Sequence, residues 1–301
     1  MKLVPRAPHK EEIKEVEHVH QVGELHYKKG DKISTRLVFG NTLKKLGDND
    51  KWIIGLDADV KNSTFSIKLK DAHPDQFIDC YVAEQNLVGT SIGVCKRHRI
   101  PFCSTFAAFF TRAADHIRMG AISQANVKFV GTHAGISIGT DGPSQMALED
   151  FALFRPIPHS LVFYPSDAVA MENAMVLSAN YKGIVYIRAN RPDTPIIYDN
   201  TEKFEIGDNK VVWQSENDKV TIVTAGVTLF EAFQAADALA AEGTHVRIID
   251  LFSIKPINPK NIIEAAHKTN GLILTVEDHY AEGGLAEAVR SAVSTHGFKI
   301  H

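Results

Sequence analysis

Apolar and polar positions along this chain follow two different rhythms. Short runs of apolar residues, such as those at 52–57, 127–130 and 184–188, have the length of buried strands, and the segments between them carry apolar residues at helical spacing. Strands that alternate with helices are typical of βαβ units, whose parallel sheet is covered by helices on both faces. The pattern therefore predicts an α/β fold in which functional residues gather at the carboxyl ends of the strands.

The first part of the chain contains the longest uninterrupted alternation. In chain order we expect a helix ending at Gly47, strands at 52–57 and 77–82, a helix after Glu84, a short strand around Phe102, a helix from Thr105, strands at 127–130 and 161–164, a helix capped at Pro165-Ser166 that runs to about Asn180, and a strand at 184–188. Residues 191–219, with Pro192, Pro195 and Gly207, interrupt this order and mark a boundary.

A second unit follows the interruption. It begins with the apolar run at 220–226 and continues through a helix ending at Gly243, strands at 246–250 and 272–276 and a helix near Gly284. Residues 298–301 resemble the start of a strand with nothing after it, so we expect an exposed sheet edge there. A chain of 301 residues with 44% hydrophobic residues can bury two cores. We therefore predict two doubly wound, mostly parallel-sheet domains at 31–195 and 220–301, joined by a linker at 196–219.

Residues 1–30 differ from the rest because they are rich in Lys, Glu and His and show no clear period. We interpret them as an arm that packs weakly. His18, His20 and His26 lie close together in this arm. Since no cysteine or paired carboxylate accompanies them, we expect solvated side chains and not a metal site.

Composition narrows the class of protein. The net charge of −3 comes from interspersed acidic and basic residues, which argues against nucleic acid as a partner. No apolar run approaches the roughly 20 residues that span a bilayer, and the N-terminus lacks the apolar segment of a signal peptide. We therefore expect no membrane contact. Cys80, Cys95 and Cys103 form no CxxC pair and no zinc-like spacing, so we expect reduced thiols and a cytoplasmic protein.

One acidic side chain stands out as a candidate for chemistry. Glu84 lies between a predicted strand and a predicted helix, and a cluster of phenylalanines follows at 106–110. A carboxyl group at a strand end beside buried rings is a suitable place for proton transfer. Taken alone, however, a paired structural glutamate and phenylalanines that belong to the core are the more common arrangement.

Several motifs, taken together with their order along the chain, favour a chemical role for Glu84 over a structural one. The segments 84–86, 105–113, 131–133, 139–150 and 276–279 resemble the pyrimidine-binding and C-terminal parts of transketolase, closest to the animal type. The resemblance runs from about Asp31 to near the last residue. Transketolases begin with a pyrophosphate-binding domain that carries a Gly-Asp-Gly motif, and this sequence contains no such motif. We therefore expect that the pyrophosphate-binding domain is missing and that the chain stops inside the C-terminal domain.

The resemblance implies thiamine diphosphate as cofactor. It assigns Glu84 as the carboxyl group that reaches N1′ of the aminopyrimidine, and Phe109 as the ring on which the aminopyrimidine stacks. Phe106 would line the same pocket, and Gln145 and Asp59 would lie near the cofactor. The ligands of the accompanying Mg²⁺ or Ca²⁺ are expected on the missing domain, so we assign no metal ligand in this chain. Phe110 is expected to be a core residue.

The same resemblance supplies a substrate site for sugar phosphates. It assigns Arg36, Ser63, His133 and Arg191 to the phosphate and Asp141 to a substrate hydroxyl. Arginine suits a phosphate because its planar guanidinium donates two parallel hydrogen bonds. Taken singly, these residues also fit surface ion pairs, a turn serine and a loop histidine. Their joint occurrence in family order is what favours the site.

Three functions are therefore considered. The first is the catalytic half of a transketolase, which would move a two-carbon ketol unit from a ketose phosphate to an aldose phosphate. It would act as a homodimer, with a separate pyrophosphate-domain chain, or both, and the chain would be inactive alone. The second is a related enzyme, either deoxyxylulose phosphate synthase or the β subunit of a 2-oxoacid dehydrogenase. The third is a noncatalytic paralogue with a binding or regulatory role. The phosphate-type residues favour the first, and the presence of Glu84, Phe109 and His133 weighs against the third.

Overall fold

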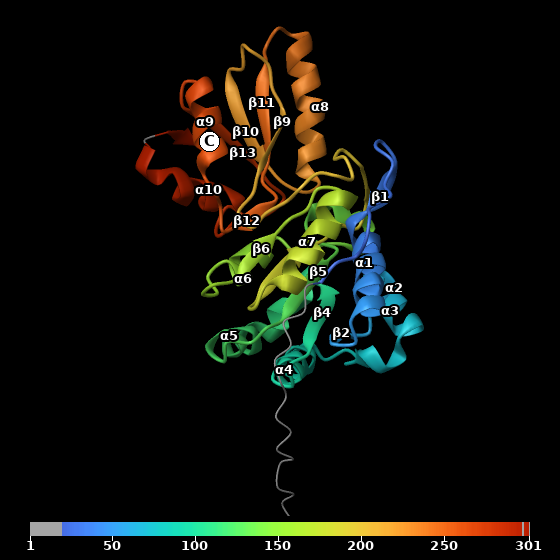
Figure 1. Cartoon of the computed structure of the whole chain (residues 1–301). Coiled ribbons are helices and arrows are strands. Elements are labelled where there is room, and N and C mark those ends of the chain that lie inside the picture. Colours follow the sequence, from blue (N-terminus) through green and yellow to red (C-terminus); the bar gives the residue numbers. More distant parts are fainter. Residues whose placement is uncertain (1–19, 297, 301) are drawn as a thin grey trace, which may run out of the picture.

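The computed structural model describes residues 20–296 and 298–300, which form two α/β domains that lie end to end (Figure 1). The α/β class and the two mostly parallel sheets predicted from the sequence are confirmed. Among the described residues, none of the helices is both long and apolar enough to cross a bilayer.

The first domain is built on a seven-stranded sheet with the order β12-β6-β7-β5-β4-β2-β3. Its strands are β2 (Ile53–Asp57), β3 (Phe77–Asp79), β4 (Ile100–Phe106), β5 (Lys128–Thr132), β6 (Leu161–Phe163), β7 (Val185–Arg188) and β12 (Ser253–Lys255). All neighbouring pairs are parallel except β12 with β6. Every residue of β2, β5, β6 and β7 is buried, as expected for a sheet covered on both faces.

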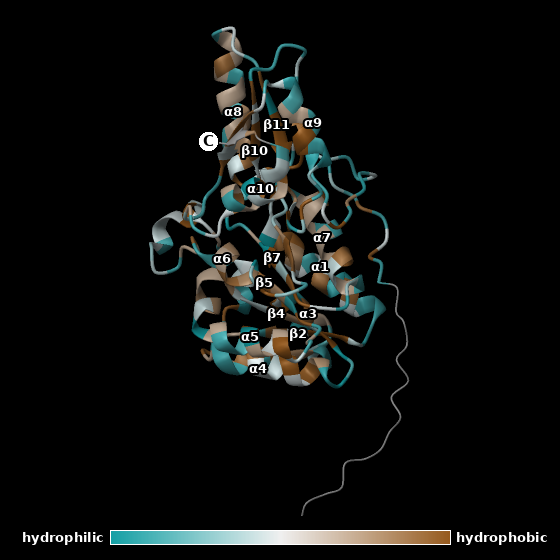
Figure 2. Ribbon diagram, turned by 90° about the vertical axis from the view of Figure 1, so that its left-hand side faces the viewer, coloured by the Kyte–Doolittle hydropathy of each residue, from teal (hydrophilic) through white to brown (hydrophobic). Residues whose placement is uncertain are grey.

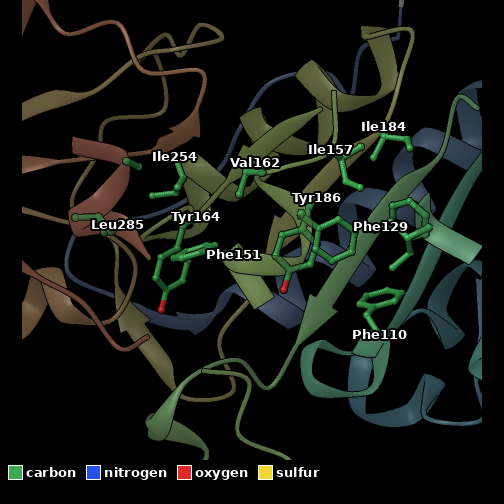
Figure 3. Close-up of a cluster of buried hydrophobic side chains, with 14 of the residues drawn as sticks. Phe110, Phe129, Phe151, Ile157, Val162, Tyr164, Ile184, Tyr186, Ile254 and Leu285 are labelled. Atoms are coloured by element: carbon green, nitrogen blue, oxygen red, sulfur yellow. The ribbon is translucent and has the colours of Figure 1, made fainter. Parts of the chain in front are cut away.

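Helices cover both faces of this sheet. They are α1 (Thr35–Asn49), α2 (Lys61–Thr64), α3 (Ile67–Ala72), α4 (Glu84–Cys95), α5 (Ala114–Ile122), α6 (Asp150–Phe154) and α7 (Ala168–Asn180), with 3₁₀ turns at Pro74–Gln76, Ala107–Ala113 and Ile136–Asp141. α1 and α7 pack over one buried cluster, and α4, α5 and α6 pack over another. In the second cluster Phe110 is fully buried and meets Phe129 edge to face, so its prediction as a core residue is confirmed (Figure 3).

The second domain has a five-stranded sheet with the order β14-β13-β10-β11-β9. Its strands are β9 (Lys210–Trp213), β10 (Val220–Thr224), β11 (Val246–Asp250), β13 (Leu272–Val276) and β14 (Lys299–Ile300), and its helices are α8 (Thr228–Ala241), α9 (Lys260–Lys268) and α10 (Leu285–Val293), followed by a 3₁₀ turn at Ser294–His296. β14 lies at one edge of this sheet, as expected. Hydrophobic segments gather in β10, β11 and the helices that flank them, while the connecting loops are mostly hydrophilic (Figure 2).

The two domains share parts of their structure. β12 follows β11 in sequence but adds to the first sheet, where it pairs antiparallel with β6. The buried cluster beneath α6 continues across the boundary, since Ile254 and Leu285 pack with Phe151 and Tyr164 (Figure 3). β1 (Lys32–Ser34) and β8 (Asp193–Pro195) form a separate antiparallel pair that joins the two ends of the first domain.

Three local predictions were wrong. The helix expected from Thr105 is the end of β4, and the turns that follow it at Ala107–Ala113 are 3₁₀. Thr105 and Phe106 pair with Gly131 and Thr132 of β5, so the sheet holds them extended. Residues 196–219, predicted as a linker, contain β9, which extends the second sheet. α7 is capped not at Pro165-Ser166 but by Asp167, whose carboxylate accepts a hydrogen bond from Ala170 N.

The arm is also different from its prediction where it is described. His20 is 6% exposed, and its backbone N–H donates to Asn180 Oδ1 at 2.9 Å. Tyr27 OH donates to the buried Glu172 carboxylate at 2.5 Å. Residues 20–30 therefore pack on α7, because these buried polar contacts hold them there. His26 is exposed as expected, whereas His18 lies outside the described residues.

Candidate functional site

Glu84 lies at the junction where the first sheet meets α4. The chain leaves β3 at Asp79, turns through Tyr81 at a φ of 54°, and starts the helix at Glu84 itself. The residue is only 5% exposed, and one carboxylate oxygen accepts a short hydrogen bond from Arg112 Nη1. The free backbone N–H groups of the first helical turn favour an anion at this position. The candidate acid is thus buried, at a strand-to-helix turn, and faces a cation.

Phe109 and Phe106 are linked to this carboxylate through Arg112. Their rings stack with centroids 5.2 Å apart, and the guanidinium of Arg112 lies 4.3 Å from the centroid of the Phe109 ring. Phe109 is half-buried, whereas Phe106 is 8% exposed. Arg112 therefore covers one ring and pairs with Glu84 at the same time, although half of its own side chain is exposed to solvent.

His133 connects the aromatic rings to a group of arginines. It follows the last residue of β5 and has a left-handed backbone with a φ of 57°. Its imidazole stacks on Phe106 at 3.9 Å, its Nε2 lies 3.4 Å from Arg36 Nη1, and its Nδ1 lies 3.0 Å from Thr132 Oγ1. Burial and the neighbouring Arg36 lower the pKa of the His133 imidazole to about 4. At neutral pH this ring is a neutral hydrogen-bonding group.

Arg36 and Arg191 come from opposite ends of the first domain. Arg36, near the start of α1, donates to the carbonyl oxygens of Ser63 at 2.9 Å and Arg191 at 3.2 Å, and its guanidinium lies 5.1 Å from the Phe65 ring. Burial and the second arginine lower the pKa of the Arg36 guanidinium. Arg191 donates to Ile138 O at 2.5 Å and pairs with Asp141 at 3.5 Å.

These contacts form one continuous row, which we call the site row. In order it contains Glu84, Arg112, Phe109, Phe106, His133, Arg36 and Arg191. Three of its members stand at the carboxyl ends of neighbouring parallel strands, since Phe106 ends β4, His133 follows β5 and Arg191 follows β7. The sheet order is therefore what brings these distant sequence positions together.

Two predicted residues lie apart from the row. Asp59 is exposed, has a φ of 66°, and places its carboxylate 3.5 Å from Lys61 Nζ. Gln145 is half-buried, and its backbone N–H donates to Gly142 O at 3.2 Å. Among the described residues no hydrogen bond or ion pair joins either side chain to Glu84 or Phe109. Ser63 contributes a backbone carbonyl to Arg36 and not a hydroxyl.

Sequence reasoning gave no role to Arg112 or Phe65. Arg112 is the only charged residue in the segment 105–113, and a cation three residues after Phe109 could have signalled the pairing. Phe65 gives no such signal, because its position under Arg36 depends on a backbone φ of 63°. In the part of the chain that the structure describes, no group of three or more His, Cys, Asp or Glu side chains is arranged to hold a metal ion.

Comparison with known families agrees with this geometry. Residues 31–196 match the transketolase pyrimidine-binding domain, and residues 209–301 match the transketolase C-terminal domain. Human transketolase is 58% identical over 268 residues, which is 89% of this chain and 43% of that protein. Bovine transketolase-like protein 1 is 55% identical over 89% of this chain and 45% of its own length. The chain thus spans less than half of these relatives.

Two solved structures are similar in fold. A split gene transketolase, described as an inactive beta4 tetramer, superposes with a TM-score of 0.79 at 38% identity and covers 90% of this chain and 88% of its own. Transketolase from Campylobacter jejuni has a TM-score of 0.74 at 18% identity over 91% of this chain and 48% of its own, which supports the fold alone. On the two family matches and these relatives, the chain belongs to the transketolase family.

Proposed function

We propose that this chain is the catalytic half of a transketolase and that it transfers a two-carbon ketol unit from a ketose phosphate to an aldose phosphate. The observation that carries the proposal is the site row, which joins a buried acid, a stacking surface and a cluster of phosphate-type cations without interruption. A carboxyl group at one end and guanidinium groups at the other suit a substrate that reacts at one end and carries a phosphate at the other.

The aromatic end of the row is suited to the aminopyrimidine of thiamine diphosphate. The guanidinium of Arg112 is flat and rich in N–H donors, and it lies against Phe109 while it binds the Glu84 carboxylate. An aminopyrimidine is also flat and can make the same two contacts once the half-exposed Arg112 side chain moves aside. We therefore assign Phe109 to stacking and Phe106 to the wall of the pocket.

Glu84 would hold or release a proton at the ring nitrogen that faces it. When bound, the cofactor supplies the carbon that accepts the two-carbon unit. The protein's part is to keep the carboxyl group buried at a helix start and to exclude water from it with the rings of Phe106 and Phe109. Gln145 and Asp59 would reach the cofactor only at the rim of the pocket that Phe106 and Phe109 form.

The cationic end is suited to the substrate phosphate. Arg36 and Arg191 supply positive charge, and neutral His133 supplies a hydrogen-bonding ring between them and the cofactor pocket. Ser63 lies beside Arg36, and Asp141, which pairs with Arg191, would bind a substrate hydroxyl. Other thiamine-dependent enzymes, such as deoxyxylulose phosphate synthase or the β subunit of a 2-oxoacid dehydrogenase, remain alternatives. An oxoacid substrate has no phosphate for these arginines.

A partner is part of the proposal. The human relative is more than twice as long as the matched region, and a structural neighbour is a split gene transketolase described as inactive in its beta4 form. We infer that a pyrophosphate-binding chain or domain supplies the ligands for Mg²⁺ or Ca²⁺, and that this chain contributes half of each site in a dimer or larger assembly. Cys80, Cys95 and Cys103 are free thiols, which accords with a cytoplasmic enzyme.

Reconstitution tests the proposal. The chain is mixed with a transketolase pyrophosphate-domain chain, thiamine diphosphate and Mg²⁺, and ketol transfer between sugar phosphates is followed by NMR. We expect transfer by the mixture and none by either chain alone. Glu84→Gln should abolish transfer with unchanged circular dichroism, whereas the exposed control Glu282→Gln should not. Full activity of Glu84→Gln, or submicromolar binding of the cofactor by the isolated chain in calorimetry, would refute the proposal. A mixture without transfer would support the noncatalytic paralogue.

A further inference from the structure

The carboxyl edge of the second sheet is occupied by the first domain. β10 pairs with β11 on one side and with β13 on the other, so the ends of β10 and β13 border the crevice where open α/β sheets commonly bind ligands. Gly226, just after β10, lies so close to Tyr164 of the first domain that an added Cβ would overlap its ring. The crevice therefore holds protein side chains in place of a ligand.

Asp278, just after β13, is the polar centre of this contact. It is 4% exposed, its Oδ1 accepts from Arg188 Nη1 at 2.6 Å, and the hydroxyl of Tyr164 lies 3.1 Å from the same oxygen. Arg188 is fully buried, pairs also with Asp150 at 2.8 Å, and lies against the rings of Tyr164 and Phe151. A buried guanidinium between two carboxylates is held in one orientation.

Asp278 and Arg188 also contact the loop that follows β5. We call residues 135–148 the substrate loop, because it carries Ile138 and Asp141, which both hold Arg191. The loop is closed at its base by a bridge between Ala134 and Ala147, next to His133. The base is thus the point at which the loop meets the site row.

Asp278 and Arg188 both contact this base, and we call these contacts the clamp. Arg188 Nη2 donates to Ala147 O at 2.9 Å and to the backbone oxygen of Asp278 at 3.0 Å. Gly135, whose N–H donates to Ala147 O at 3.0 Å, leaves so little space that an added Cβ would overlap Asp278 Oδ2. Tyr280 N donates to Leu148 O at 2.8 Å, which ties the segment after β13 to the end of the loop.

From these contacts we infer that Asp278 is a positioning residue, through which the second domain holds the substrate loop and, with it, His133 and Arg191 of the phosphate end. The inference rests on the proposed function, since it deepens the role of that phosphate site. Asp278 itself touches neither cofactor nor substrate in this scheme. Its effect is transmitted by Arg188 and the base of the loop.

A ligand-free measurement tests the clamp. Asp278→Asn keeps the size of the side chain and an acceptor for Arg188, but it removes the charge. We expect amide hydrogen exchange at Ala134 and Gly135 to speed up at least about tenfold, and the NMR signals of the His133 ring to shift. The matched control is Asp250→Asn. Asp250 is also a buried second-domain carboxylate and accepts a hydrogen bond from Ser166 at 2.7 Å, but among the described residues no hydrogen bond or ion pair joins it to the loop.

The second readout is binding of ribose 5-phosphate to the full chain, followed by the same ring signals. We expect Asp278→Asn to weaken this affinity about tenfold and Asp250→Asn to leave it within about twofold of the unchanged chain. Unchanged exchange in Asp278→Asn, equal losses in both variants, or faster exchange with unchanged affinity would each overturn the positioning role. If Asp278→Asn does not fold, Tyr164→Phe removes one contact to the same carboxylate and is expected to show smaller changes of the same sign.

If the proposed function fails, the results differ from those expected when the positioning role fails. In that case the unchanged chain itself shows no preference for ribose 5-phosphate over ribose, while exchange at Ala134 and Gly135 still responds to Asp278→Asn. That result would leave the clamp as a structural joint between the domains and would remove its role at a phosphate site.

Discussion

Replacing Arg36 with methionine is expected to raise the pKa of the His133 imidazole. Burial is the larger cause of the low value, and the Arg36 guanidinium, 3.4 Å from Nε2, is the second. Methionine keeps much of the apolar stem and removes the charge, so desolvation stays and the repulsion between two cations goes. We therefore expect a partial return from about 4 toward 6.5 and not a full one.

The magnitude follows from the size of the shift. A difference between 6.5 and about 4 corresponds to ~3 kcal/mol between the two protonation states of His133. Because the unfolded chain binds this proton more tightly, the stability that depends on His133 is complete above pH 6.5 and is lost as the pH falls toward 4. In Arg36→Met this loss should shrink by on the order of 1 kcal/mol.

The assay is an NMR titration of the histidine rings, with the His133 signal assigned from His133→Gln. In the unchanged chain the His133 signal should stay in its neutral form from pH 8 down to about pH 5, and in Arg36→Met it should begin to titrate within that range. Asp141→Asn is the control of opposite sign, because Asp141 raises the pKa of His133 and its removal should lower it further.

Two results would refute this reasoning. One is a His133 signal that titrates near 6.5 in the unchanged chain, which would mean that the ring is solvated. The other is a shift in the same direction for Arg36→Met and Asp141→Asn, which would mean that neither charge acts directly on the ring. Chemical denaturation at pH 7 and pH 4.5 provides the matching stability difference for each variant.

Two further predictions concern the joint between the domains. Gly226→Ala should lower the free energy of unfolding by about 2–4 kcal/mol, because its Cβ would overlap the Tyr164 ring and φ is 61°, and denaturation would show this. Gly243→Ala, at a φ of 81° with nothing within 4 Å, should cost about 1 kcal/mol, and equal losses would contradict the steric argument. Burial raises the pKa of Asp250 to about 7, so stability should fall as pH rises from about 4 to 7, and Asp250→Asn should flatten that slope. If denaturation shows the same slope of stability against pH for Asp250→Asn and for the unchanged chain, the raised pKa of Asp250 is contradicted.

Much of the fold could be predicted because its strands and helices are encoded locally. The apolar runs of β2, β5 and β7 are buried on both faces, so their sequence pattern reports their environment directly. The place of Glu84 between a strand and a helix was also readable, since α4 begins at that residue. Its role and those of the other assigned residues came from the family resemblance and stay proposals.

Other features depend on contacts between distant residues. The sequence pattern at Thr105 predicts a helix, but pairing with β5 extends β4 through Phe106. β9 lies in a segment rich in turn residues and is a strand because β11 offers an edge. The sequence places Arg112 three residues after Phe109, but its contact with Glu84 exists because the turn at Ala107–Ala113 directs its side chain back to α4.

The amino-acid sequence by itself determined the alternation of strands and helices, the division into two sheets and the identity of the chemical groups, because these depend on neighbours along the chain. Only the tertiary structure decided which of those groups meet. Parallel strand order placed Phe106, His133 and Arg191 at one edge, and the docking of the second domain placed Asp278 against the loop beside them. The physical reason is that burial and hydrogen bonding between distant segments set the position and charge of a side chain, and neither is a property of its sequence neighbours.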